Sequence, residues 1–336
     1  MKKRVLHLLA SNKYSGAENV ACTIINNMSD EYEMGYCSPD GPISEVLAEK
    51  EIKFIPIKKL NVSELAKIIK EYSPNIIHAH DFKASLIASL FSKKAIVISH
   101  IHKNDPEMRK FSLKSFLYLL TSKKYKKIIG VSDSVLNEYI YSDKIRDKYI
   151  TIQNYVDKEE VIKKSNDFKC DKKYDLFFIG RLSEEKNPLE FINVVKNLQM
   201  CDINCAIIGD GPLRQNCEDL IKEYNLEKNI EMLGFQSNPF PFVKNSKIGI
   251  MPSKFEGFGI TAIESLILGK PVLNSGVGGL KEIFKDNEFL ICSSTKDYVF
   301  KAKKILNNEF KLLNDLNVYT DKKKYVDNLN EIYLNK

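Results

Sequence analysis

The feature that most constrains the fold is the alternation of short apolar runs with helix-periodic segments, which continues along almost all of the 336 residues. Runs such as VLHLLA (5–10), NIIHAH (75–80) and DLFFIG (175–180) have the length and apolar character of buried strands. Segments such as 17–28 and 188–198 place apolar residues at helical spacing. Strands that alternate with helices predict α/β architecture, with parallel sheets covered by helices on both faces.

The alternation divides into two halves of about 150 residues each, which predicts two Rossmann-like domains. Residues 1–155 form the expected N-terminal domain and residues 173–315 the C-terminal one. The charged segment 156–172 has no clear period and is the expected linker, and 316–336 ends the chain in a helical pattern. Further expected strands are 52–57, 95–101, 127–132, 149–154, 204–209, 229–235, 247–253, 270–275 and 288–293, and further expected helices are 63–72, 83–91, 113–122, 212–224 and 261–269.

Composition narrows the class of protein. The seven cysteines are scattered without a C-x-x-C pair, as in reduced cytosolic proteins. No apolar run reaches the roughly 18 to 20 residues that span a bilayer, and the N-terminal MKKRVLHLLA reads as a first strand, not as a signal peptide. The net charge of +7 favours anionic partners. Because no nucleic-acid recognition motif is present, we expect nucleotides, phosphates or acidic lipids, and no nucleic acid.

Ligands of open parallel sheets bind beyond the carboxyl ends of the strands, so the residues that follow each strand are the candidate site. Gly16 follows the first strand and opens a helix, where it serves either ligand approach or a tight turn. Arg181 and Lys186 follow strand 175–180; two cations in one loop suit a diphosphate, although solvated surface charges are the alternative. Gly209 and Gly211 form a strand–turn–helix junction with exposed backbone donors.

The stretch KFEGFGITAIES (254–265) carries the sharpest signal. Glu256 lies in a glycine-rich turn, and Glu264 lies in the first turn of the helix that follows. The helix N-terminus attracts anions, and Phe258 and Gly259 offer amides there. Two carboxylates beside these amides can bind hydroxyls on two parts of one ligand, whereas capping and solubility are the alternative roles. A later turn, SGVGGLKEIF (275–284), is another candidate phosphate or sugar-hydroxyl cradle.

Two H-x-H pairs end neighbouring expected strands, His78 with His80 and His100 with His102. Four imidazoles at adjacent strand ends can bind a metal, or one of them can hydrogen-bond a substrate, or some can be buried core residues. His102 precedes a polar loop and is the preferred functional histidine. We predict no metal site.

Taken together, these motifs resemble the retaining glycosyltransferases of the GT-B fold in glycosyltransferase family 4, the group 1 glycosyltransferases. The resemblance covers almost the whole chain and reproduces the E-x7-E spacing of the family. It rests on Ser15-Gly16-Ala17-Glu18, Gly180-Arg181-Leu182, Glu185-Lys186-Asn187, Gly209-Asp210-Gly211-Pro212, Leu233-Gly234-Phe235, Glu256-Gly257-Phe258-Gly259, Glu264, Gly269-Lys270-Pro271-Val272 and Gly278-Gly279-Leu280-Lys281-Glu282.

The resemblance implies two Rossmann-like domains whose parallel sheets face each other across a cleft, with a nucleotide-diphosphate sugar held by the C-terminal domain. Arg181 and Lys186 would hold the diphosphate, Glu264 the ribose, and Glu256 the donor sugar. The implied catalytic residues are His102, Arg181, Lys186 and Glu256. The implied donor-binding residues are Gly16, Gly180, Arg181, Lys186, Gly209, Gly211, Phe235, Glu256, Gly257, Phe258, Gly259 and Glu264.

The resemblance also implies sugar transfer with retention to a glycan or lipid-linked acceptor, in cell-surface polysaccharide or glycoconjugate synthesis, without a cofactor or bound metal. The final helix would cross back to the first domain. His100 competes with His102 for the position near the donor sugar. Two segments depart from the family pattern: Ser15 replaces a glycine, and 153–157 lacks the Pro and Gly of the usual crossing. A nucleotide-sugar epimerase and a non-catalytic nucleotide-sugar-binding homologue are the alternatives.

Segment 108–127 has seven basic residues and no acidic one. As a helix, it would bury a stripe of Leu113, Phe116, Leu117 and Leu120. Phe111, Lys114 and Tyr118 would then form a basic aromatic face, which suits an anionic membrane surface. The expected location is therefore cytoplasmic, with peripheral binding to the inner face of the plasma membrane; an ordinary solvated face is the alternative.

Overall fold

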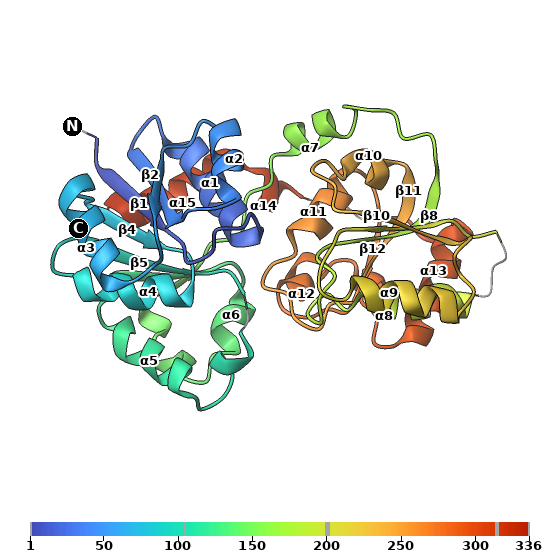
Figure 1. Cartoon of the computed structure of the whole chain (residues 1–336). Coiled ribbons are helices and arrows are strands. Elements are labelled where there is room, and N and C mark those ends of the chain that lie inside the picture. Colours follow the sequence, from blue (N-terminus) through green and yellow to red (C-terminus); the bar gives the residue numbers. More distant parts are fainter. Residues whose placement is uncertain (1, 104, 199–201, 313–315, 335–336) are drawn as a thin grey trace. The chain divides into compact units, whose positions relative to one another are not determined.

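The computed structural model describes residues 2–103, 105–198, 202–312 and 316–334. The chain forms two compact units (Figure 1). The first contains Met1–Tyr155 together with Asp321–Lys336, and the second contains Val156–Thr320. Each unit is a parallel sheet covered by helices. Among the helices described, none has the length and apolar character needed to cross a bilayer.

The first unit is built on a seven-stranded sheet in the order β3-β2-β1-β4-β5-β6-β7, and every neighbouring pair is parallel. This is the doubly wound order of Rossmann-like folds. Its strands are β1 (Arg4–Leu8), β2 (Glu33–Pro39), β3 (Phe54–Ile57), β4 (Ile76–Ala79), β5 (Ile96–Ile101), β6 (Lys127–Gly130) and β7 (Tyr149–Thr151). Its helices are α1 (Gly16–Met28), α2 (Ile43–Glu49), α3 (Val62–Tyr72), α4 (Phe82–Ala88), α5 (Leu113–Ser122), α6 (Asp133–Asn137) and α15 (Lys322–Leu334).

Side chains alternate between the two faces of this sheet, as the strand period requires. Leu6, Leu8, Ile77 and Ala79 join the main apolar core, to which α3, α4 and α5 contribute. The intervening residues of the same strands face the other side, where α15 packs against α1. Residues 321–334 therefore complete the first unit although they follow the whole of the second unit in the chain.

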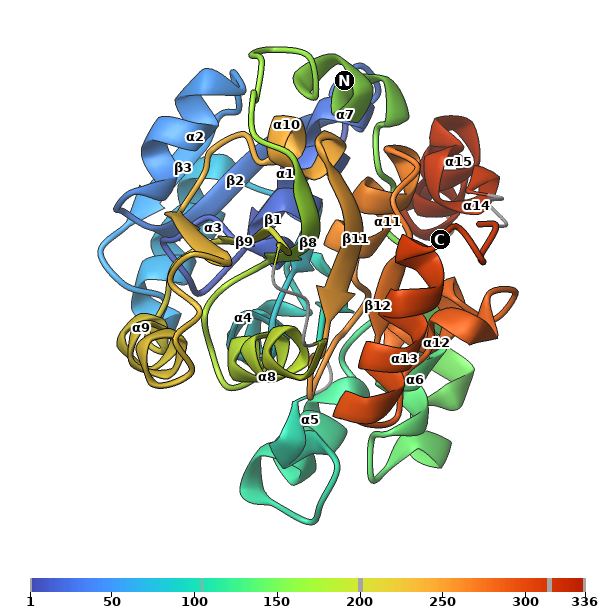
Figure 2. The ribbon, with the colours of Figure 1, turned by 90° about the vertical axis from the view of Figure 1, so that its right-hand side faces the viewer.

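The second unit has a five-stranded parallel sheet in the order β10-β9-β8-β11-β12. Figure 2 shows β8 and β11 side by side at its centre. Helices α7, α10 and α11 cover one face, and α8, α9 and α13 the other (Figure 1). The strands are β8 (Tyr174–Ile179), β9 (Cys205–Ile208), β10 (Ile230–Gly234), β11 (Ser246–Met251) and β12 (Val272–Asn274). The helices are α7 (Lys158–Lys164), α8 (Pro188–Leu198), α9 (Arg214–Glu223), α10 (Phe240–Lys244), α11 (Ile260–Ile267), α12 (Gly279–Ile283), α13 (Thr295–Leu306) and α14 (Asn317–Thr320).

The segment 156–172, interpreted from the sequence as a linker, contains α7 and belongs to the second unit. Asp157 caps this helix by accepting a hydrogen bond from the backbone N–H of Glu160, and Val161 is buried. Helix α7 packs against α11 and α10. Because only one side chain of this short helix is buried, its sequence has no repeating apolar pattern from which a helix could be predicted.

The expected orientation of α5 is wrong. Its buried residues are Ser115, Tyr118 and Ser122, whereas Leu113, Phe116 and Leu120 are exposed by 74%, 46% and 50%. The Tyr118 hydroxyl hydrogen-bonds the Ser99 hydroxyl at 2.8 Å, and its ring packs against Tyr125 and Tyr139. The buried face of α5 is therefore polar and aromatic, and its more apolar stripe lies on the protein surface.

Candidate functional site

Four loops at the carboxyl edge of the second unit's sheet carry most of the predicted residues of that unit. They follow β8, β9, β11 and β12, and hydrogen bonds join them to one another. The N–H of Leu182 donates to the carbonyl of Asp210 at 3.0 Å, and the N–H of Lys254 donates to the carbonyl of Glu185 at 2.8 Å. The Ser275 hydroxyl donates to the Ser253 carbonyl at 2.6 Å. The loops thus form one connected surface above neighbouring strands.

Close backbone packing explains several glycines of these loops. A β-carbon on Gly209 would lie 2.0 Å from the carbonyl oxygen of Gly180, and one on Gly278 would lie 1.6 Å from that of Glu256. Both glycines have positive φ, +142° and +54°, where side chains are disfavoured. This packing explains the adjacent glycines of the ligand-binding turn expected at 275–284. Gly278 and Gly279 lie directly against the backbone of the turn that contains Glu256.

Lys186 and Glu256 form an ion pair, although 70 residues separate them in the chain. Lys186 lies in the loop after β8, and Glu256 lies in the loop after the adjacent β11. Their side chains are 27% and 11% exposed. The Ser253 hydroxyl is 3.5 Å from the same carboxylate. Arg181, from the loop of Lys186, is exposed. The fold therefore places two cations and one carboxylate at the ends of two central strands.

Glu264 lies in the second turn of α11, not in the first turn as expected from the sequence, and is partly buried. Burial raises the pKa of its carboxyl from 4.5 to about 7. The charge of Lys164 lowers this pKa and that of Glu160 raises it, both from the packed helix α7. Sequence reasoning missed these two residues because they lie in the expected linker.

The turn between Glu256 and α11 is buried. Phe258 is buried, and its ring meets that of Tyr319 edge-on at 5.7 Å. Gly257 is buried as well. Gly259 caps α11 with φ +105°, a conformation that favours glycine. Phe258 therefore anchors the turn through its side chain, so any contact it offers a ligand comes from its backbone. Phe235, by contrast, is 76% exposed after β10.

The remaining predicted residues lie in the first unit. Gly16 begins α1 and is exposed, and a β-carbon built on it meets no atom within 4 Å. The neighbouring Glu18 is buried and accepts a hydrogen bond from the Ser15 hydroxyl. Burial raises the pKa of Glu18. Glu18 was not among the predicted site residues, although it belongs to the same S-G-A-E motif.

The structure separates the two competing histidines by exposure. His100 is in β5 and is fully buried, whereas His102 follows β5 and is partly buried. The Nδ1 of His102 is nevertheless buried, and its Nε2 lies 3.0 Å from His80 Nδ1, so the choice between the two histidines stays a prediction.

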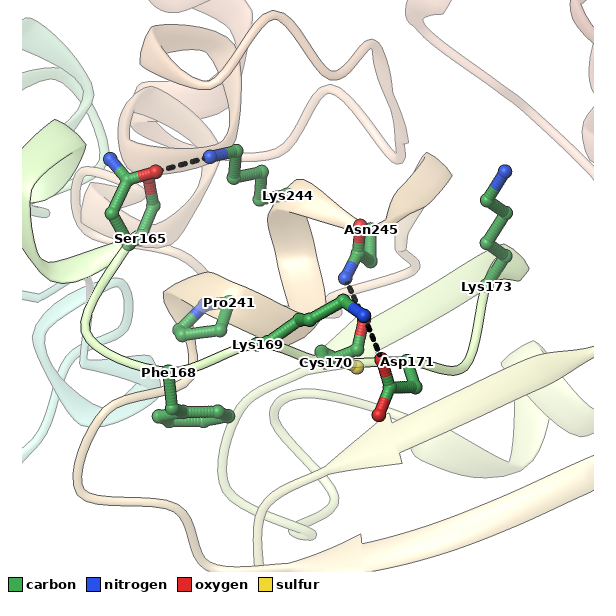
Figure 3. Close-up of a pocket in the computed structure, with 10 residues that line it drawn as sticks. Ser165, Phe168, Lys169, Cys170, Asp171, Lys173, Pro241, Lys244 and Asn245 are labelled. Atoms are coloured by element: carbon green, nitrogen blue, oxygen red, sulfur yellow. Dashed lines mark hydrogen bonds and ion pairs between the residues drawn. The ribbon is translucent and has the colours of Figure 1, made fainter.

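A pocket of about 440 Å³ lies elsewhere in the second unit (Figure 3). Its lining comes from residues 165–173 and from the end of α10, including Lys169, Lys244 and Asn245. It adjoins the residues where β8 and β11 begin, whereas the candidate site lies where these strands end. None of the predicted site residues lines it.

Comparison with known proteins identifies the family. Residues 157–323 match the family described as glycosyl transferases group 1, and residues 14–160 match glycosyltransferase family 4. Two uncharacterized glycosyltransferases of Methanocaldococcus jannaschii are each 30% identical to the chain. One alignment covers 263 residues, 74% of this chain and 71% of that protein; the other covers 63% and 58%.

Two further proteins match over most of their length. The N-acetylgalactosamine-N,N'-diacetylbacillosaminyl-diphospho-undecaprenol 4-alpha-N-acetylgalactosaminyltransferase of Campylobacter jejuni is 26% identical over 329 residues, 88% of each chain. The crystal structure of Anabaena HepE in complex with UDP superimposes with a TM-score of 0.78 at 16% identity, and covers 98% of this chain and 95% of that one. The chain therefore belongs to the group 1 glycosyltransferases of family 4 and has their GT-B fold.

Proposed function

We propose that the protein is a retaining glycosyltransferase that moves a sugar from a nucleotide-diphosphate sugar to a glycan or lipid-linked acceptor, without a bound metal, in cell-surface polysaccharide or glycoconjugate synthesis. The observation that carries the proposal is the Lys186–Glu256 ion pair at the ends of β8 and β11, with Arg181 in the same loop as Lys186. The undecaprenol-linked acceptor named for the Campylobacter relative and the UDP bound by HepE agree with it.

The chemistry follows from these charges. When the bond between the sugar C1 and the diphosphate oxygen breaks, its electron pair leaves with the nucleoside diphosphate. Arg181 and Lys186 offset the charge that develops there, which is the role that a metal ion has in other transferases. The acceptor hydroxyl forms its bond to C1 on the same face and passes its proton to the departing phosphate. Glu256 holds hydroxyls of the donor sugar, and Glu264 holds those of the ribose.

Thermal-shift titration with UDP-glucose, UDP-galactose, UDP-N-acetylglucosamine, UDP-N-acetylgalactosamine and GDP-mannose tests the donor site. A donor at one hundred times its Kd stabilises the folded protein by about 2.7 kcal/mol. We expect one of these donors to raise the Tm of the wild type and not of Glu264→Gln. The matched control is Glu231→Gln, which removes a carboxylate at the opposite edge of the same sheet, paired with Lys172. An unshifted Tm with every donor would favour a non-catalytic homologue, and sugar isomerisation without acceptor would favour an epimerase.

The pKa of Glu264 also gives the donor-free protein a pH dependence. Because the folded-state pKa is raised from 4.5 to about 7, the stabilising contribution of the protonated acid is full below pH 4.5 and is lost as pH rises through 7. The shift corresponds to at most roughly 3 kcal/mol at pH 8. We expect Glu264→Gln to unfold at a higher Tm than the wild type at pH 8, and the difference to vanish near pH 5. A constant difference across this range would contradict the assignment.

We further propose that α5 docks the first unit on an anionic membrane. Phe111 and Leu113 are 78% and 74% exposed, and Lys123 and Lys124 at the end of the helix are exposed as well. Apolar side chains flanked by basic ones suit insertion at an acidic lipid surface, where each cation contributes about 1 kcal/mol.

Sedimentation with vesicles tests this docking. The wild type should bind vesicles that contain phosphatidylglycerol, and binding should weaken as salt rises. Because each apolar side chain contributes roughly 1.5–3 kcal/mol on burial, the Phe111→Ser/Leu113→Ser variant should bind at least about tenfold less. Leu90→Ser, which alters a side chain 56% exposed in the same unit, is the control and should bind as the wild type does. Equal binding to neutral and anionic vesicles would refute the proposal.

A further inference from the structure

All five histidines of the chain lie together in the first unit, and the sequence of the second unit contains none. His7 pairs with His78 in the parallel register of β1 and β4. Every ring centroid lies 4.1–5.4 Å from those of at least two other histidines. His7, His78 and His100 are fully buried, His80 is 1% exposed and His102 is partly buried. Groups that ordinarily titrate between pH 5 and 8 are therefore confined to one unit.

Three pairs of imidazole nitrogens face each other at hydrogen-bond distance. His7 Nδ1 lies 2.9 Å from His80 Nε2, and His80 Nδ1 lies 3.0 Å from His102 Nε2. His78 Nε2 lies 3.1 Å from His100 Nδ1. Each pair can hold only one proton, because a second proton would set two N–H groups against each other with no acceptor between them.

This geometry limits how many protons the folded cluster can carry. Five imidazolium rings have ten N–H groups, but with one proton in each of the three facing pairs, the folded rings carry at most seven. Five neutral rings carry five protons, so the folded cluster can gain at most two, whereas the five histidines of the unfolded chain can gain five. The folded state therefore binds at least three protons fewer, whichever way the hydrogen bonds run.

Burial and mutual repulsion reduce this uptake further. Burial lowers the pKa of His7 and of His102 from 6.5 to about 3. Burial, and then the charges of other histidines, hold the pKa of His78 and His100 well below 6.5. A histidine in an unfolded chain titrates near 6.5. The cluster therefore stays neutral while pH falls through the range in which the unfolded chain takes up protons.

The groups around the cluster do not offset a positive charge on it. Burial raises the pKa of Tyr36 and Tyr333 still further above neutrality, so both stay neutral in acid. Burial also raises the pKa of Glu18, which favours the neutral carboxyl. The Asp81 carboxylate accepts hydrogen bonds from the N–H groups of Ala10 and Ala84. The surrounding titratable groups are Tyr36 from β2, Tyr325 and Tyr333 from α15, Glu18 and Cys22 from α1, and Lys3, Tyr14, Tyr32, Asp81 and Lys103 from connecting segments.

Helix α15 covers the cluster. The Tyr333 hydroxyl lies 2.7 Å from His78 Nδ1, and the Tyr333 ring meets that of His78 edge-on at 5.8 Å. The helix also packs against α1. Water can therefore reach the histidine face only when α15 separates from it.

We propose that the histidine cluster is an acid-sensitive switch, which releases α15 and opens the first unit as pH falls below about 6, while the second unit stays folded. Because the unfolded state binds more protons below pH 6.5, the stability of the first unit is full above this pH and is lost as pH falls. Each proton of difference raises the equilibrium constant of unfolding tenfold per pH unit, so three protons raise it about a thousandfold. Folding constants of small domains are roughly 10³–10⁸, so one or two pH units remove much of the stability.

Hydrogen exchange of the full chain, followed by mass spectrometry at pH 6 and pH 5, tests the switch. Division by the intrinsic chemical exchange rates gives the opening constant of each unit. Between these pH values, the opening constant for peptides of β1, β4, β5 and α15 should rise by more than about a hundredfold, and that for β8 and β11 by less than about tenfold. A smaller rise in the first unit, or an equal rise in both units, would overturn the proposal.

A bound metal is the competing use of the cluster. His7, His78 and His80 form one triplet whose nitrogens lie within 4.8 Å of one another, and His80, His100 and His102 form another. The exchange experiment is therefore run with and without EDTA. We expect the same rise in both buffers; a rise that depends on EDTA would assign the cluster to a metal and overturn the proposal.

Two variants separate titration from packing. His7→Asn removes one titrating ring and keeps an amide near the position of Nδ1, so the rise between pH 6 and pH 5 should be up to about tenfold smaller. Tyr333→Phe is the control, because it removes the hydroxyl at His78 and keeps all five rings. It should weaken protection equally at both pH values and leave the rise unchanged.

An unchanged rise in folded His7→Asn would contradict the role of the histidines. If this variant fails to fold, the comparison of the two units in the wild type still decides. Return of the wild type from pH 5 to pH 7 should restore protection of the first unit, and a loss without recovery would refute a switch. Because these measurements need no donor, they remain informative if the thermal-shift titration finds none.

Discussion

Lys186→Ala should lower kcat for sugar transfer by about 10²–10³-fold, the loss expected when one preorganised group that stabilises developing charge is removed. Lys186 is the only cation that the described structure pairs with Glu256. Its removal takes a positive charge from the expected diphosphate position and leaves a carboxylate that is 11% exposed without its partner. Initial rates with the donor identified by thermal shift, measured well below the Tm of the variant, give the effect.

Lys254→Ala is the control for this prediction. Lys254 is a nearby lysine whose side chain pairs with Glu184 on the surface, with exposures of 50% and 74%. Exposed ion pairs contribute little, so its rate should stay within about twofold of the wild type. A Lys186→Ala enzyme with more than a tenth of the wild-type kcat would remove this residue from the catalytic group. An equal loss in both lysine variants would point to a general charge effect.

Gly278→Ala should destabilise the second unit by more than about 3 kcal/mol. The new β-carbon would lie 1.6 Å from the carbonyl oxygen of Glu256, and the backbone φ of +54° is unfavourable for alanine. The turn that carries Glu256 must move to relieve the clash. We therefore expect the donor-induced thermal shift to disappear together with the stability, as measured by denaturant unfolding and thermal-shift titration.

Gly269→Ala separates backbone strain from the clash. Gly269 has φ +73°, and a β-carbon there meets no atom within 4 Å. Its substitution should cost only about 1 kcal/mol, the strain of the left-handed conformation, and should leave donor binding intact. Similar losses of stability in the two variants would mean that the loops do not need the close approach of Gly278 to Glu256.

The sequence was sufficient to predict two parallel α/β domains, because apolar strands and amphipathic helices follow one another with little interruption. Strand β2 was not predicted from the sequence. Its sequence, EMGYCSP, contains Gly35, Ser38 and Pro39, so it lacks an apolar run. Pairing with β1 and β3 buries it, and Gly35 leaves room for Ile55 and Tyr72, 2.7 and 3.3 Å from where a β-carbon would lie. Tertiary packing, not local composition, makes this segment a strand.

The expected strand 288–293 was wrong for a related reason. Glu288–Leu290 form a 3₁₀ turn, and Ile291 makes one isolated bridge to Asn274. The side chain of Asn274 donates to the carbonyl of Leu290 at 3.2 Å and so provides part of the bonding that a strand partner would give. Apolar character predicted burial correctly, since Leu290 is buried, but it could not distinguish a turn from a strand.

At the candidate site, the sequence identified the loops because parallel strands deliver their following residues to one edge. The roles of Arg181, Lys186, Glu256 and Glu264 toward a donor stay predictions. Sequence spacing could not reveal that Glu160 and Lys164 act on the pKa of Glu264 or that Tyr319 packs on Phe258. These contacts join segments whose own patterns carry no chemical signal.

The place of α15 in the first unit has a consequence for biosynthesis. Its Tyr333 is buried against His78 and Tyr32, yet the ribosome makes it only after all of Val156–Thr320. At 5–20 residues per second, this delay is roughly ten to thirty seconds. During that interval, the face of the nascent sheet that carries the histidines lacks its covering helix, so this surface is where a chaperone would be expected to bind the newly made chain.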